Sequence, residues 1–199
     1  VADLGVDLLS VAGHKLYAPK GIGALYVKSG MKLEKLIYGA DHEQDRRAGT
    51  ENVPAIVGYA KAMELAKKEM ADNDRKISAM AEEFRHRVMR EIPDVRFNGP
   101  EEGRIKATVS LCFKGAEGEA IILNLDMKGI GVTSGSACTS GSLEPSHVLR
   151  AMGVPFTAAH GSIRFSLSVY NTEEEINFII EKLPPIIARL RELSPFWQE

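Results

Sequence analysis

Residues 51–92 read ENVPAIVGYAKAMELAKKEMADNDRKISAMAEEFRHRVMREI, and this stretch determines how the rest of the chain divides. Its apolar residues recur at the spacing of a helix face, and neither Gly nor Pro occurs between Tyr59 and Glu91. We therefore predict one long helix, or a pair of helices. A helix of this length often joins two domains. We therefore place a domain boundary between residues 70 and 71, which divides the chain into 1–70 and 71–199.

Two apolar runs precede this helix. Residues 6–11 and 23–27 are predicted to be strands, and the Gly- and Pro-containing loop 13–21 separates them. Residues 28–48 are polar and irregular. Loops between strands often carry functional side chains, so the segment 13–21 is the first place to look for chemistry.

Shorter elements follow Pro93. The predicted elements are strands over 95–97, 108–113 and 162–168, helices over 116–128 and 146–152, a loop over 129–141, and a final helix opened by Asn171. Residues 162–168 alternate with period two, which places Arg164, Ser166 and Ser168 on one face of a strand. Strands and helices intermix along the whole chain, which predicts an α/β or α+β fold.

Composition excludes several classes of protein. The chain has 199 residues, 44% hydrophobic and 26% charged, with a formal net charge of −2, which excludes disordered and fibrous proteins. No basic run exceeds a pair, so we expect no nucleic-acid partner. No apolar run approaches the ~20 residues of a membrane span. Cys112 and Cys138 fit neither a metal knuckle nor a disulfide scaffold, so we expect a reducing, cytoplasmic location and no metal.

Lys15 follows the first predicted strand. A lysine at the end of an apolar strand can be partly desolvated, which lowers its pKa and leaves an amine able to form a Schiff base with an aldehyde. An ordinary solvated lysine in a surface loop remains the alternative.

The two cysteines differ in their surroundings. Cys138 lies in the stretch SGSACTSG, residues 134–141, whose small residues predict an exposed and reachable thiol suited to a nucleophile. Cys112 lies inside the predicted strand 108–113 and is expected to be an inert core residue. An inert role for Cys138 stays open.

Two further sites are suited to anions. Arg46, Arg47 and Thr50 precede the long helix, where a hydroxyl, cationic side chains and a helix N-terminus can bind phosphate; a simple N-cap is the alternative. Arg164 can hold a carboxylate through two hydrogen bonds, although a structural ion pair is the commoner role of such an arginine.

Four blocks of the sequence together resemble the pyridoxal-phosphate-dependent cysteine desulfurases. They are GHKLYAPKGIG (13–23), RAGTEN (47–52), SGSACTSGSLEPS (134–146) and SIRFSL (162–167). The third block resembles the subclass with a long cysteine loop that feeds iron–sulfur cluster assembly. The resemblance implies the C-terminal part of the type-I, aspartate aminotransferase-like fold and a homodimer.

The resemblance also implies the role of each site residue. Lys15 matches the lysine that holds pyridoxal 5'-phosphate, and His14 matches a residue near the cofactor phosphate. Thr50 matches a phosphate ligand that reaches the partner subunit's site. Cys138 matches the nucleophile that takes sulfur from L-cysteine as a persulfide, leaving L-alanine, and Arg164 matches the clamp on the substrate carboxylate. The sulfur would pass to iron–sulfur scaffold proteins and other acceptors.

Two departures from the family pattern stand out. Ala12 occupies the position of a serine that often binds phosphate. The half of a family member that precedes the lysine strand has no counterpart, and Val1 opens directly on apolar sequence. We therefore expect a C-terminal half: residues 1–70 as the remnant of the large cofactor-binding domain with the start of the linking helix, and 71–199 as a complete small α+β domain. Such a piece should bind cofactor poorly and turn over little.

Two alternatives remain open. A selenocysteine lyase or a sulfinate-processing relative would use the same cofactor and a related fold, although the long cysteine loop disfavours both. A module without catalysis, in which the small domain and final helix dock scaffold proteins, is the alternative from another class of function.

Overall fold

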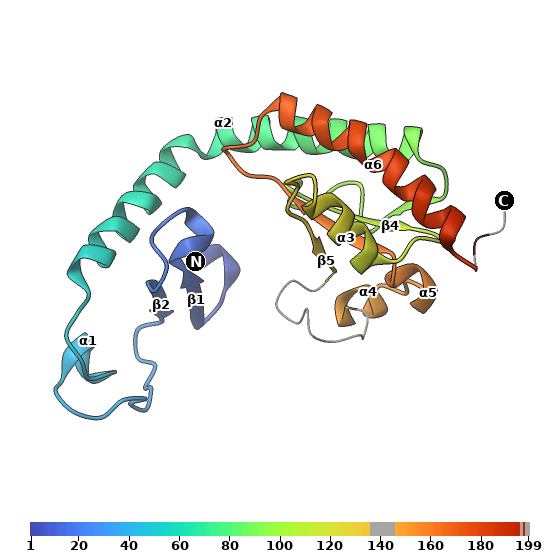
Figure 1. The fold of residues 1–199 in the computed structure, drawn as a ribbon. Helices are drawn as coiled ribbons and strands as arrows, with labels where there is room; N and C mark the ends of the chain where they lie inside the picture. The colour runs from blue at the N-terminus through green and yellow to red at the C-terminus, as the bar shows by residue number, and fades with distance from the viewer. Residues whose placement is uncertain (136–145, 196, 198–199) are drawn as a thin grey trace. The chain divides into compact units, whose positions relative to one another are not determined.

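The chain folds into two compact units, residues 1–71 and 72–199, in a computed structural model that describes every residue except 136–145, 196, 198 and 199. The helix α2 (Val53–Glu91) is one unbroken helix that contributes its first part to one unit and its second part to the other (Figure 1). The division falls one residue after the predicted boundary. No helix among the described residues is both long enough and apolar enough to cross a membrane.

The first unit is built on a two-stranded antiparallel sheet. Strand β1 (Leu8–Ala12) pairs with β2 (Gly23–Val27), and Leu8 lies opposite Val27. The bounds predicted for β2 are confirmed, whereas β1 starts and ends later than predicted. The unit also contains η1 (Ala2–Leu4), η2 (Gly13–Leu16) and a short turn, α1 (His42–Asp45).

This unit has almost no buried core. All of its residues are described, and among them only Gly13, Ala55 and Tyr59 are buried. Large apolar side chains that stay exposed in it include Leu8, Leu25, Tyr26, Leu36, Tyr38, Val57 and Met63. Because an isolated two-stranded sheet is marginally stable at best, the first unit lacks the burial that normally stabilises a fold.

The second unit contains a four-stranded antiparallel sheet in the order β3-β4-β6-β5. Its elements are β3 (Val95–Phe97), β4 (Thr108–Phe113), α3 (Gly118–Asp126), β5 (Thr133–Ser134), α4 (His147–Ala151), α5 (Phe156–Ala159), β6 (Ser162–Ser166) and α6 (Glu173–Leu193). The bounds predicted for β3 and β4 are confirmed. The prediction of a loop throughout 129–141 is wrong at β5, because two residues are too few to show alternation.

The two faces of this sheet differ in polarity. Val109, Leu111 and Phe113 alternate along β4 and pack with Ile163 and Phe165 against the second part of α2, α3 and α6 (Figure 1). On the opposite face, Cys112 packs with Leu149, Val154 and Ala159 from the region of α4 and α5. The rest of that face carries Asn98, Ser110, Arg164 and Ser166, so it is the polar side of the sheet.

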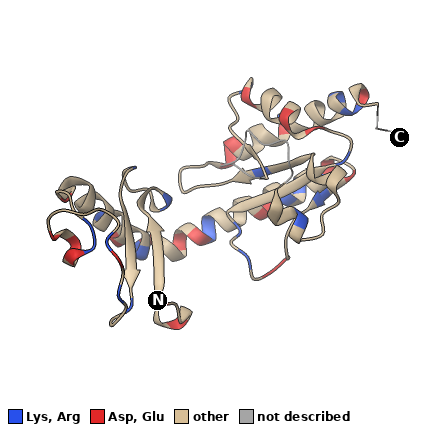
Figure 2. Cartoon of the chain, turned by 90° about the horizontal axis from the view of Figure 1, so that it is seen from below, with Lys and Arg blue, Asp and Glu red and all other residues tan. Residues whose placement is uncertain are grey.

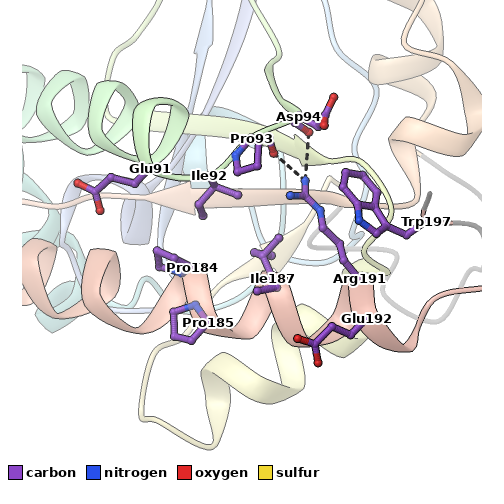
Figure 3. A pocket seen from close by; sticks show the side chains of 11 residues that line it. Glu91, Ile92, Pro93, Asp94, Pro184, Pro185, Ile187, Arg191, Glu192 and Trp197 are labelled. Carbon is purple, nitrogen blue, oxygen red and sulfur yellow. Dashed lines mark hydrogen bonds between the residues drawn. The ribbon is translucent and has the colours of Figure 1, made fainter. Parts of the chain in front are cut away.

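Both ends of α6 are fixed by side chains. Thr172 and Glu175 form a capping box, as an acidic first turn after a capping residue predicts. Near the other end, the buried Arg191 donates from Nη2 to the carbonyl of Pro93 at 2.8 Å and from Nε to that of Lys114 at 2.9 Å. Its guanidinium also lies 4.2 Å from the ring centroid of Trp197, at the edge of a cavity of about 650 Å³ (Figure 3).

Short acidic and basic stretches are interspersed along the described chain (Figure 2). This distribution matches the near-neutral net charge and offers no strong field for steering a charged macromolecule.

Candidate functional site

Lys15 lies on a tight turn, η2, directly after β1. The backbone N–H of Gly13 donates to the carbonyl of Ile22 at 2.9 Å, and that of Ala18 donates to the carbonyl of Gly13 at 3.2 Å. A Cβ atom at Gly13 would stand 2.7 Å from the Ile22 oxygen, so only glycine fits there. The turn therefore presents His14 and Lys15 side by side at the end of the hairpin, and both are exposed.

The exposure of Lys15 corrects one prediction. The sequence predicts partial desolvation at the strand end, but Lys15 is exposed within residues 1–71, although the neighbouring Gly13 is buried. Among the described residues, Lys15 also has no carboxylate within ion-pair distance. Its amine is thus available to an aldehyde, the reaction for which an uncommitted lysine is suited.

Thr50 lies before α2 rather than at its N-cap. The Oδ1 atom of Asn52 accepts from the N–H of Ala55 at 3.3 Å, so the capping role that the sequence left open belongs to Asn52. Thr50 is exposed and its hydroxyl has no hydrogen bond within the described part of the chain. The guanidinium of Arg47 bonds to the carbonyl of Gly49 and lies 3.2 Å from Glu43, which holds this segment against itself.

These residues fit a phosphate-bearing aldehyde by the chemistry of their donors. Lys15 offers an amine, His14 an imidazole and Thr50 a hydroxyl, and all three side chains are exposed in one unit. Amine, imidazole and hydroxyl donors near a helix N-terminus are typical of anion sites. Ala12, which cannot donate from its side chain, contributes nothing to such a site.

Arg164 lies at the centre of the polar face in the second unit. It is placed opposite Ser110 on β4 and opposite Thr133 on β5. Its Nε atom is buried and has no hydrogen-bond partner. No carboxylate forms an ion pair with Arg164 among the described residues, so the structural ion pair left open by the sequence is not found there. A planar cation without a counterion suits an anionic ligand.

Cys138 lies outside the described residues, but both ends of its segment are described. A Cβ atom on Gly135 would stand 3.1 Å from Cβ of Ser146 and 3.2 Å from Oγ of Ser162. Ser162 and Arg164 are two residues apart on β6 and therefore share one face of the sheet. The segment that carries Cys138 thus begins and ends beside the face that carries Arg164.

Cys112 is inert, as the sequence predicts. Its side chain is buried, and its Sγ atom accepts from Nδ2 of Asn98 at 3.1 Å. Burial raises the pKa of the Cys112 thiol, which keeps it protonated and therefore a poor nucleophile.

Sequence reasoning missed Asn98 and Ser110. Asn98 is buried, and its Nδ2 atom donates to Oγ of Ser110 at 3.2 Å beside Arg164. The available signal was the polar position of Ser110 inside an otherwise apolar strand. The proximity of Asn98 depends on the register between β3 and β4, which no local pattern reveals.

Comparisons with known proteins place the chain in a family. The family model described as aminotransferase class-V matches residues 1–179. A cysteine desulfurase of Gluconacetobacter diazotrophicus is 50% identical over 96% of this chain and 48% of its own length. The cysteine desulfurase IscS of Dictyoglomus turgidum is 48% identical over all of this chain and 50% of its own. The chain therefore spans about half the length of the curated relatives that it matches.

Solved structures show the same relationship. A NifS-like protein superposes with a TM-score of 0.85 at 34% identity, covering 96% of this chain and 48% of the other. A NifS-like protein from Rickettsia africae also gives a TM-score of 0.85, at 31% identity over 94% of this chain and 49% of the other.

Proposed function

The chain belongs to the aminotransferase class-V family, and from that premise we propose that it is the part of a pyridoxal-phosphate-dependent cysteine desulfurase that holds the substrate carboxylate and carries the sulfur-accepting thiol. The reaction takes L-cysteine to L-alanine and leaves the sulfur as a persulfide on Cys138. Residues 1–71 act as part of the cofactor-binding domain, and residues 72–199 act as the small domain.

The observation that carries this proposal is the state of Arg164. It is a half-buried cation on the polar face of a sheet, and no carboxylate of the described residues neutralises it. An α-carboxylate would supply the missing charge and accept two parallel hydrogen bonds from the guanidinium. This contact orients an amino-acid substrate without taking part in bond breaking.

Lys15, His14 and Thr50 are the residues proposed to hold the cofactor. Pyridoxal 5'-phosphate, when bound, supplies the electron sink that weakens bonds at the substrate's α- and β-carbons. The amine of Lys15 anchors the aldehyde carbon and afterwards moves a proton at the α-carbon. The imidazole of His14 and the hydroxyl of Thr50 donate to the phosphate, and in the proposed homodimer Thr50 serves the site of the partner subunit.

Cys138 is proposed to receive the sulfur. Its thiolate attacks the substrate sulfur, a sulfur–sulfur bond forms, and the carbon–sulfur bond breaks with its electron pair left on the substrate carbon. That carbon takes up a proton, so L-cysteine and a thiol give L-alanine and a persulfide. Gly135 and Ser146, the described residues on either side of the Cys138 segment, lie beside the face of Arg164. Transfer to an iron–sulfur scaffold protein or another acceptor completes the cycle.

The exposed apolar side chains of the first unit help to decide whether this chain alone or the whole protein is active. Four of the five residues of β2 are exposed within residues 1–71, and β1 alternates between exposed and half-buried residues. The activity is therefore proposed for the whole protein, whose length in the curated relatives is about twice that of this chain.

The test joins this chain to the other half of the Dictyoglomus turgidum relative and measures alanine released from L-cysteine and from L-selenocysteine. A desulfurase releases alanine from cysteine and gains one sulfur atom on Cys138 by mass spectrometry, and Cys138→Ser abolishes cysteine turnover. Retained selenocysteine turnover in Cys138→Ser, with no cysteine turnover in the unsubstituted protein, would instead identify a selenocysteine lyase.

A further inference from the structure

Four polar residues form a line across the sheet of the second unit. The N–H of Asn98 donates to the carbonyl of Ser110 at 2.9 Å, which extends the pairing of β3 and β4 by one residue. Ser110 lies opposite Arg164, and Arg164 lies opposite Thr133. Directly opposed residues in antiparallel strands point to the same face, so all four side chains share the polar face.

Asn98 is the fixed end of this line. Its side chain is only 8% exposed. Its Nδ2 atom donates to Oγ of Ser110 at 3.2 Å and to Sγ of Cys112 at 3.1 Å, so both amide hydrogens have partners on β4. The Oδ1 atom of Asn98 is buried and has no partner, so the contacts to β4 are the ones that hold this side chain, and Ser110 is held by the same contact.

Arg164 is the free end of the line. Its Nε atom is buried and has no hydrogen-bond partner, so a ligand from solvent cannot reach it. A carboxylate must therefore bind the two Nη groups, and Nε is left to donate within the protein. Buried donors without a partner are rare in proteins, and each one calls for a structural or functional explanation.

Ser110 is the neighbour that another strand holds in place to accept from Nε. The hydroxyl of Thr133 also has free lone pairs, but its hydrogen bond runs to the carbonyl of the next residue, Ser134, at 2.9 Å, so no neighbouring strand fixes it. The hydroxyl of Ser110 accepts one hydrogen bond, from Asn98, and an sp³ oxygen has a second lone pair. That second lone pair is on the strand directly opposite Arg164.

We propose that Asn98 and Ser110 are positioning residues for Arg164. Asn98 holds the hydroxyl of Ser110, and this hydroxyl accepts from Nε of Arg164 when the two Nη groups bind a carboxylate. The sheet then fixes the plane of the guanidinium before the ligand binds. Less side-chain conformational entropy is therefore lost on binding. The inference rests on the proposed function for the identity of the ligand as an α-carboxylate.

The experiment uses this chain joined to the other half of the Dictyoglomus turgidum relative, as in the test of the proposed function, and labelled with ¹⁵N-arginine. Sodium L-alanine is titrated in while the Nε–H signal of Arg164, assigned by its loss in Arg164→Lys, is followed by NMR. We expect that signal to shift on binding, and we expect Asn98→Ala and Ser110→Ala to raise the Kd roughly 10- to 100-fold, the effect of losing one hydrogen bond to a charged group. Ser110→Thr keeps the hydroxyl and should keep the affinity.

The control is Asn124→Ala. Asn124 donates from Nδ2 to the carbonyl of Ala120 at 2.8 Å inside α3, so it also loses a side-chain hydrogen bond but lies outside the line. Its Kd should equal that of the unsubstituted chain. With alanine bound, the Nε–H of Arg164 should exchange with solvent faster in Asn98→Ala and Ser110→Ala, and at an unchanged rate in Asn124→Ala.

Other outcomes overturn the inference in distinguishable ways. If Arg164→Lys abolishes binding while Asn98→Ala and Ser110→Ala leave the Kd unchanged, the clamp stands and the positioning role fails. If Asn98→Ala and Ser110→Ala lower the Tm but leave the Kd unchanged, the two residues have a purely structural role, and the positioning role again fails. If alanine does not shift the Arg164 signal in the unsubstituted chain, the carboxylate clamp and the positioning role both fail. Should Asn98→Ala not fold, the pair Ser110→Ala and Ser110→Thr decides.

Discussion

The two units of this chain are of similar sequence character but differ sharply in burial. The second unit encloses a continuous core in which Phe84, Leu111, Ile121 and Leu183 are at most 1% exposed. The first unit buries three residues and leaves Leu25 at 51% and Tyr38 at 76% exposed. Apolar content therefore does not make a core, because burial requires a second layer for the apolar face to pack against.

The largest expected effect is a loss of unfolding free energy when a core side chain of the second unit is truncated, compared with a truncation in the first unit. Phe84→Ala removes a ring whose centroid lies 4.7 Å from that of Phe165, and it should destabilise the second unit by about 3–5 kcal/mol. Trp197 is the only tryptophan, so urea unfolding followed by its fluorescence reports on the second unit. Leu25→Ala in the first unit should leave this transition within about 0.5 kcal/mol of its original free energy. Equal losses from the two changes would refute the comparison.

A smaller effect tests whether the first unit depends on its turn rather than on a core. Gly13→Ala places a Cβ atom 2.7 Å from a backbone oxygen, so the hairpin must open, at a cost of about 1–3 kcal/mol. Hydrogen exchange at the N–H of Gly13, which is bonded to Ile22, measures the opening. Gly131→Ala, where a Cβ atom meets nothing within 4 Å, is the matched control and should leave stability unchanged. Unchanged exchange in Gly13→Ala would contradict the steric argument.

Backbone strain in the first unit predicts that one substitution to glycine will slightly increase the stability of a turn. Glu43, Gln44 and Asp45 have φ values of 53°, 58° and 64°, a left-handed turn that side chains disfavour. Gln44→Gly should stabilise the turn by about 0.5 kcal/mol, since relief of strain exceeds the entropy cost of glycine. Slower exchange of the Arg46 N–H, which is bonded to His42, would show it. Gln44→Ala keeps the Cβ atom and should give no gain; an equal gain there would exclude strain relief as the cause.

The smallest effect concerns an exposed carboxylate attached to the well-packed unit. A hydrogen bond from Arg85, whose Nη1 atom lies 2.7 Å from Oε2 of Glu101, lowers the pKa of that carboxyl below its usual 4.5. A lowered folded pKa gives stability that is present above the unfolded value and is lost as the pH falls through the folded pKa.

Acidification below about pH 4.5 should therefore lower the Tm of the second unit. Glu101→Gln should slightly reduce the slope of Tm against pH, because its amide does not titrate. The neighbouring Glu102→Gln should leave that slope unchanged. Identical slopes in Glu101→Gln and the unsubstituted chain would show that the pair contributes nothing measurable.

Much of the fold was predictable from local pattern. The long helix, β2, β3 and β4 follow from periodicity, and the family matches confirm the α/β fold class and the aminotransferase class-V identity. The predictions failed at β5, which has two residues, and at the exposure of Lys15, which depends on what covers the end of a hairpin. Asn52 rather than Thr50 caps α2, a distinction of two positions that helix-start signals do not resolve.

The candidate site was predictable only in part. The residue types and blocks around Lys15, Thr50, Cys138 and Arg164 indicate the chemistry, because amines, thiols and guanidinium groups bring their reactivity wherever they lie. Whether Arg164 has a counterion or an oriented neighbour is a property of strand pairing. Asn98 and Arg164 are separated by about half of the second unit in sequence and by one strand in the sheet.

By itself, the sequence determined most of the local elements and the family, since each depends on neighbouring residues or on short blocks of side chains. The tertiary structure alone decided which apolar faces are buried, which serine lies opposite Arg164 and which donor is left without a partner. Burial and register arise from contacts between distant segments, and their free energy is absent from any short window of sequence.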